Sequence, residues 1–235
     1  MVYQKRNFVA GEIYHVINRG VDKRKLFLND KDYLRFIHDL FEFNDTEPAD
    51  NVNYFFGKNP VFAKDVITKK QKSRELLVEI LAFSLMPNHY HLLLRPRFDD
   101  GIVRFMKKLN MGYSLYFNEK YVRSGALFQG RYKSILVTNE RHFIYLPYYI
   151  HLNPLDLAAP EWRDHKLKNH QEAIQFLDSY RWSSHLDYAG KKNFPSVTQR
   201  DFLVQCFGNS IDYRQNLEQW LKELDLTPIK KIILE

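Results

Sequence analysis

Two apolar runs separated by a turn constrain the fold of this chain more than any other feature. The runs Ile80–Leu85 and Leu92–Leu94 flank Pro87 and Asn88, a pair that favours a turn. We therefore predict two strands that meet at this turn. The second strand begins with His89, Tyr90 and His91. Because side chains two apart on a strand point to the same face, the two imidazoles should lie side by side, where they can bind a divalent metal.

A histidine pair alone is a weak sign of a metal site, because a strand histidine often only hydrogen-bonds a backbone carbonyl. A third ligand is needed. The stretch from Tyr145 to Pro154 contains Tyr149 and Asn153, which are four residues apart and would share one face of a helix. Asn153 would then offer an oxygen to the metal, with Tyr149 next to it.

Three motifs in order resemble those of the REP-associated tyrosine transposases, part of the wider His-hydrophobic-His group of single-strand DNA endonucleases that use one tyrosine. The motifs are Met86–Leu93, Gly125–Lys133 and Tyr149–Pro154. Together they are much more specific than any one alone, and the resemblance covers roughly residues 8 to 190. It implies that a metal is held by His89, His91 and Asn153, and we hypothesise that this metal is Mg²⁺ or Mn²⁺. It also implies that Tyr149 is the nucleophile that becomes covalently joined to DNA.

A nucleophilic tyrosine must be activated, because a phenol with a pKa of roughly 10 is mostly protonated at neutral pH. We hypothesise that the metal polarises the scissile phosphate for in-line attack by Tyr149. By the resemblance, a 5′-phosphotyrosine forms and frees a 3′-hydroxyl that can later reverse the reaction. Tyr113 is the rival nucleophile, but its helical neighbours are hydrophobic, which suits packing. We expect His15 to be structural.

The charge distribution favours a nucleic-acid partner. The chain carries a net charge of +7, and its sequence pI is about 9.3. The stretch from Gly101 to Val137 contains seven Lys or Arg residues and one acidic residue, Glu119, so its net charge is 7 − 1 = +6. The glycines, aromatics and cations of Gly125–Lys133 suit contact with a single strand. The predicted DNA-binding residues are Arg19, Arg104, Lys107, Lys108, Arg123, Arg131 and Lys133.

The order of elements predicts an α+β fold. Strands near residues 12, 78, 89 and 134 with helices between them favour a ferredoxin-like antiparallel sheet with flanking helices. We expect residues 1–155 to form the transposase/endonuclease core, with a polar insertion at about residues 44–77. Residues 156–235 would form a helical C-terminal extension, which either grips the foot of a DNA hairpin or only covers a hydrophobic face.

A single cysteine, Cys206, rules out an intramolecular disulfide and a multi-cysteine zinc site. The sequence shows no secretory segment and no apolar run of membrane-spanning length. We therefore expect a soluble bacterial protein of the cytoplasm. Its partner should be single-stranded or hairpin DNA, without a membrane or a small-molecule cofactor. We expect a monomer, with a dimer as the alternative.

Two other functions fit the same residues. In a metal nuclease, His89 and His91 would activate water and Tyr149 would only pack, so cleavage would survive Tyr149→Phe without a covalent adduct. In a non-catalytic regulator, the protein would bind folded single-stranded DNA or RNA in a salt-sensitive way and cleave nothing.

Overall fold

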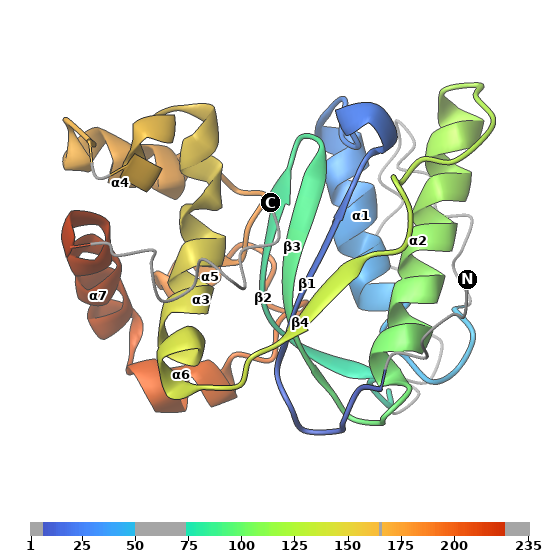
Figure 1. Ribbon diagram of the computed structural model, residues 1–235, viewed down its shortest axis with the longest axis horizontal. Coiled ribbons are helices and arrows are strands. Elements are labelled where there is room, and N and C mark those ends of the chain that lie inside the picture. Colours follow the sequence, from blue (N-terminus) through green and yellow to red (C-terminus); the bar gives the residue numbers. More distant parts are fainter. Residues whose placement is uncertain (1–6, 50–73, 165, 224–235) are drawn as a thin grey trace, which may run out of the picture.

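A four-stranded antiparallel sheet forms the centre of the molecule, in the order β2-β3-β1-β4 (Figure 1). The computed structural model describes residues 7–49, 74–164 and 166–223. The strands are β1 (Tyr14–Arg19), β2 (Val78–Met86), β3 (His89–Pro96) and β4 (Lys133–Leu136). Helix α1 (Asp30–Glu42) connects β1 to β2, and α2 (Gly101–Lys120) connects β3 to β4. This order and connectivity are ferredoxin-like, which confirms the predicted fold class.

The strand register places the two histidines on one face of the sheet. Strands β2 and β3 form a hairpin in which Met86 lies opposite His89, so the predicted turn falls between them. Arg19 of β1 also lies opposite His89. Directly opposed residues point to the same face, so His89, His91 and Arg19 share a face while Tyr90 points to the other.

Helices α1 and α2 cover the face to which Tyr90 points (Figure 1). The N-cap residue of α1 is Asn29, and the side chain of Asp32 accepts hydrogen bonds from the backbone in return, which forms a capping box. The apolar stripe of α1, including Phe36 and Leu40, packs with Tyr113 of α2 in a core rich in aromatic rings.

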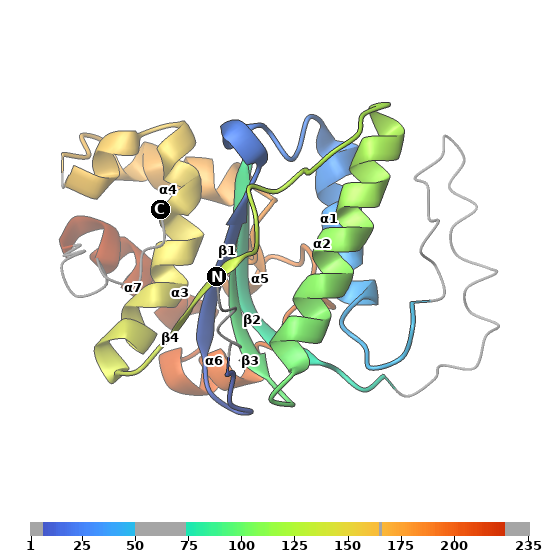
Figure 2. The same ribbon diagram turned by 45° about the vertical axis from the view of Figure 1, so that its right-hand side comes forward.

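Helix α3 (Glu140–Leu152) covers the opposite face, and the C-terminal helices lie on the same side of the sheet (Figure 2). Asn139 caps α3, since its side chain accepts a hydrogen bond from the His142 amide at 2.8 Å, as predicted. Leu146 and Ile150 of α3 belong to the same buried cluster as Leu93 of β3. This packing sets which side of α3 faces the histidines.

The chain after α3 forms several short helices. They are η2 (Asn153–Leu157), η3 (Pro160–Asp164), α4 (His170–Ser179), α5 (His185–Tyr188), α6 (Asp201–Phe207) and α7 (Ser210–Glu223), while η1 (Val21–Lys23) follows β1. The segment between α4 and α5 runs along the edge of β2. The Leu85 amide donates to Trp182 O at 2.9 Å, and the Ser184 amide donates to Phe83 O at 3.0 Å. This segment therefore forms backbone hydrogen bonds to β2, the strand at the edge of the sheet.

Most of the predicted polar insertion, residues 50–73, lies outside the described residues. The boundary predicted near residue 155 stays a prediction. None of the helices in the described ranges is long and apolar enough to cross a membrane.

Candidate active site

The two strand histidines form the centre of the candidate site. Their ring centroids are 5.0 Å apart, with the rings nearly perpendicular at 75°. His91 is fully buried and His89 is half-buried, and Nε2 of each ring is shielded from solvent. The predicted strand geometry therefore does bring the imidazoles together on one face.

Hydrogen bonds at Nδ1 orient both rings. Nδ1 of His89 lies 2.7 Å from Asn88 Oδ1, and because an amide oxygen only accepts, His89 donates there and keeps its lone pair on Nε2. Nδ1 of His91 lies 2.9 Å from Nε2 of His15, and these two rings stack at 5.2 Å. His15, expected to be structural, thus supports the predicted site. The two-residue spacing of His15, Ile17 and Arg19 indicates that these side chains share a face of β1. The contact between His15 and His91 also depends on the register of β1 against β3, which the sequence alone does not reveal.

Helix α3 brings Tyr149 to the histidines. The Tyr149 ring is fully buried and its centroid lies 6.1 Å from that of His91, edge to face. One turn later, Nδ2 of Asn153 donates to the Tyr149 carbonyl at 2.9 Å, which fixes the Asn153 amide. The structure therefore brings the predicted nucleophile to His91 and places Asn153 directly below it on the helix.

Arg163, in η3, hydrogen-bonds both Tyr149 and Asn153. No role for this residue was predicted from the sequence. Its Nη1 donates to Tyr149 Oη at 2.9 Å, and its Nη2 donates to Asn153 Oδ1 at 3.0 Å. Asp156 anchors the same guanidinium through two hydrogen bonds, from Nε at 2.8 Å and from Nη2 at 2.7 Å. No spacing rule links Arg163 to the tyrosine, so the sequence offered no signal for this contact.

Three of the predicted DNA-binding residues line one cavity. Arg19, Arg131 and Lys133 surround a space of about 280 Å³ at the end of β1 and the start of β4. The backbone amide of Gln129 donates to Arg19 O at 2.9 Å, which ties the glycine-containing loop to β1. Since Arg19 is the cross-strand neighbour of His89, this basic cavity adjoins the histidine pair.

The other four predicted cations lie apart from that cavity. Arg104 and Lys108, in the first half of α2, donate to backbone carbonyls of the loop after α1. Arg123, just after α2, donates to Asn118 in the last turn of that helix and to Ala126 O, and Lys107 is exposed on α2. These residues do not join the three cations of the cavity.

The rival tyrosine, Tyr113, lies on the opposite side of the sheet. Its hydroxyl donates to Leu26 O at 2.6 Å, and the side chain is fully buried in the aromatic core. Burial raises the pKa of Tyr113 well above its usual value. These contacts agree with the packing role expected for Tyr113.

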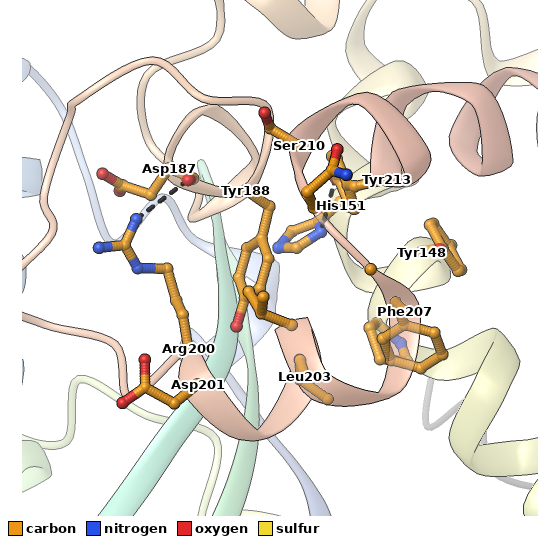
Figure 3. A pocket seen from close by; sticks show the side chains of 14 residues that line it. Tyr148, His151, Asp187, Tyr188, Arg200, Asp201, Leu203, Phe207, Ser210 and Tyr213 are labelled. Atoms are coloured by element: carbon orange, nitrogen blue, oxygen red, sulfur yellow. Dashed lines mark hydrogen bonds between the residues drawn. The ribbon is translucent and has the colours of Figure 1, made fainter.

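A second cavity, of about 360 Å³, lies between α3 and helices α5, α6 and α7 (Figure 3). His151 and Tyr213 face each other at its wall, with His151 Nδ1 2.9 Å from the Tyr213 hydroxyl. That hydroxyl lies 2.8 Å from Nδ1 of His185, and burial lowers the pKa of both histidines. This buried chain of hydrogen bonds attaches the helix that carries Tyr149 to the C-terminal helices.

The chain is similar to known transposases in part of its sequence and in its fold. Residues 50–153 match the family model described as IS200-like transposase. Among solved structures, a REP-associated tyrosine transposase bound to a REP hairpin matches with a TM-score of 0.52 and 14% identity. The match covers 86% of this chain and 93% of that one. No curated protein matches the chain. Residues 50–153 are thus similar to the IS200-like transposases, and the chain has the fold of a REP-associated tyrosine transposase.

Proposed function

We propose that this protein cleaves single-stranded DNA next to a hairpin and rejoins it through a covalent 5′-phosphotyrosine on Tyr149. The observation that carries this proposal is the packing of Tyr149 against His91, with ring centroids 6.1 Å apart. Tyr149, the proposed nucleophile, lies on the same face of the sheet as the histidine pair, whereas Tyr113 lies behind the other face. His91 and Tyr149 are 149 − 91 = 58 residues apart in the sequence, so their meeting is a property of the fold.

A divalent metal fits the side chains present. When His91 donates through Nδ1 to His15, both histidines keep a lone pair on Nε2. The third proposed ligand is the amide oxygen of Asn153, which also accepts a hydrogen bond from Arg163 at 3.0 Å. Within the described part of the chain, no group of three His, Cys, Asp or Glu side chains is placed to hold a metal, and the proposed site therefore needs the Asn153 amide as its third ligand. Mg²⁺ or Mn²⁺ held by His89, His91 and Asn153 would supply Lewis-acid polarisation of the phosphate.

The basic cavity gives the DNA strand a path to the histidines. Arg19, Arg131 and Lys133 would neutralise phosphates next to the scissile one, and Arg19 stands directly across from His89. The solved relative, which shares the fold, is bound to a REP hairpin. We therefore infer that a hairpin-associated single strand is the substrate, bound with its cleaved end over this face of the sheet.

The transfer step conserves atoms and charge. The Tyr149 oxygen bonds to phosphorus while the bond from phosphorus to the 3′-oxygen breaks. The phenol proton leaves and the departing 3′-oxygen gains one. The products are a downstream strand whose 5′-phosphate is esterified to Tyr149 and an upstream strand with a free 3′-hydroxyl. The energy of the phosphodiester is kept in the tyrosyl ester, so the reverse step needs no ATP.

The test is to incubate the protein with a labelled hairpin that carries a single-stranded flank, in Mn²⁺, and to separate the products on a denaturing gel. We expect a labelled protein band that is lost in Tyr149→Phe and kept in Tyr113→Phe. The two variants remove the same hydroxyl from buried tyrosines on opposite faces of the sheet, so they form a matched pair.

Other outcomes would reject the proposal in favour of a specific alternative. Free cleavage products without a labelled band, unchanged by Tyr149→Phe, would indicate metal-activated water. Salt-sensitive binding without any product in Mn²⁺ or Mg²⁺ would indicate a regulator that only binds structured nucleic acid.

A further inference from the structure

Arg163 holds the Tyr149 hydroxyl and the Asn153 amide with one planar group. Nη1 donates to Tyr149 Oη and Nη2 to Asn153 Oδ1, at 2.9 Å and 3.0 Å. The carbon at the centre of the guanidinium also lies 5.3 Å from the centroid of the Tyr149 ring. These contacts reach the atom proposed to attack DNA and the oxygen proposed to bind metal.

The guanidinium is itself held in place. Asp156 accepts two hydrogen bonds from it, and Trp162 donates its ring N–H to the same carboxylate at 2.7 Å. The Arg163 side chain is 23% exposed, whereas Tyr149 is fully buried. A phosphate that approaches Tyr149 from solvent along this side therefore meets the guanidinium, whose planar donors suit phosphate oxygens.

We propose that Arg163 is a further catalytic residue, which positions the Tyr149 hydroxyl and stabilises the negative charge that develops on the phenol oxygen and the phosphate during transfer. This inference rests on the proposed function. Arg163 keeps all its protons throughout: it donates hydrogen bonds to the phenol oxygen as the bond to phosphorus forms, and again when that bond breaks on rejoining. Fixed donors aimed at developing charge are a large source of rate enhancement in enzymes.

The experiment compares Arg163→Gln and Arg163→Lys with Arg97→Gln in the full chain. Arg97 follows the opposite end of β3 from His89, and Glu79, its partner, also pairs with Arg95, so the control removes the same charge far from Tyr149. The readouts are the single-turnover rate of the labelled protein band with saturating hairpin DNA and Mn²⁺, the DNA affinity, and the melting temperature.

Arg163→Gln should slow band formation by roughly 10²- to 10³-fold, with DNA affinity changed much less. Arg163→Lys should recover part of the rate, since it keeps the charge but cannot bond both oxygens. A third variant, Arg163→Ala, leaves space for a small cation. Millimolar guanidinium should restore part of its rate of band formation, and ammonium should restore less. A purely structural role for Arg163 would not give this chemical rescue.

If Arg163→Gln fails to fold because Asp156 loses its partner, the double variant with Asp156→Asn removes that uncompensated charge. The inference is overturned if the folded variant forms the band at the control rate, forms it faster, or loses only DNA affinity. Absence of a Tyr149-dependent band in the unmodified protein would instead reject the proposed function, so the two failures are distinguishable.

Discussion

Tyr149 on one face of the sheet and Tyr113 and Tyr90 on the other are all buried, but their hydroxyl groups have different partners. On the face covered by α1 and α2, the Tyr113 hydroxyl donates to a backbone carbonyl, and the Tyr90 hydroxyl donates to Asn110 Oδ1 at 2.6 Å. Burial raises the pKa of both phenols, so each keeps its proton. On the face covered by α3, the oxygen of Tyr149 accepts a hydrogen bond from a guanidinium.

This difference teaches that burial alone does not decide the role of a tyrosine. A phenol that donates to a carbonyl is a packing group with one satisfied polar atom. A phenol whose oxygen accepts from a fixed cation has a partner that favours negative charge on that oxygen. The alternation of β3 separates the two environments, because Tyr90 and its neighbouring histidines point to opposite faces.

The largest expected effect is the loss of a histidine from the α3 face. His91→Ala should slow formation of the labelled protein band by roughly 10³-fold, since several kcal/mol of charge stabilisation at the phosphate would be lost. Tyr90→Phe, its neighbour on the other face, should lower the free energy of unfolding by about 1 kcal/mol and leave the rate per folded molecule unchanged. Equal rates for the two variants would show that the faces do not differ in function.

The contact between His15 and His91 should affect metal binding more weakly. His15→Phe should weaken Mn²⁺ binding by roughly 10- to 100-fold, because His91 loses the partner at Nδ1 that orients its ring. His15→Gln offers an amide oxygen to His91 and should recover part of the affinity. Titration followed by the Mn²⁺ electron paramagnetic resonance signal measures both, and unchanged affinity in His15→Phe would leave His15 as a packing residue.

The C-terminal helices on the α3 side of the sheet should make the free energy of unfolding depend on pH. Burial lowers the pKa of His185 below its usual value of about 6.5, so the unfolded chain binds this proton at a higher pH than the folded one. The contribution of His185 to the free energy of unfolding is therefore complete above about pH 6.5. It falls below that pH by at most about 1.4 kcal/mol per pH unit.

Asp178, which hydrogen-bonds His185, also titrates, so its contribution to the pH dependence has to be separated from that of His185. Hydrogen bonds, first from His185 and then from Arg214 and Lys191, lower the pKa of Asp178, so Asp178 adds pH dependence only near and below about pH 4. Denaturant unfolding of the protein and of His185→Asn at pH 7 and pH 5 isolates the effect. If the loss of stability between these pH values is the same in both proteins, His185 is not its source.

The smallest expected effect distinguishes the cations. Arg131→Gln should lower the slope of log affinity against log salt concentration by about 1, because one phosphate contact is lost from the cavity beside His89. Lys107→Gln removes an exposed cation from α2 and should leave the slope unchanged. Equal reductions in both variants would mean that DNA also contacts α2 and that the cavity is not a preferred path.

Much of the fold could be predicted because its signals are local. The Asn139 cap, the turn at Pro87 and Asn88 and the alternation of β3 each depend on residues a few positions apart, and the structure contains all three. The helical extension was also predicted, although the pairing of Trp182 and Ser184 with the edge of β2 was not. Edge pairing leaves no periodic pattern in so short a segment.

The candidate site shows the same division. Strand and helix periods are enough to predict that His89 and His91 share a face of the sheet and that Tyr149 and Asn153 share a helix face. The contact between His91 and His15, which is 76 residues away, depends on how the strands pair in the folded protein. Tertiary packing also brought Arg163 back from η3 to the Tyr149 hydroxyl. Periodicity tells which way a side chain points, but strand register and helix packing choose what it meets.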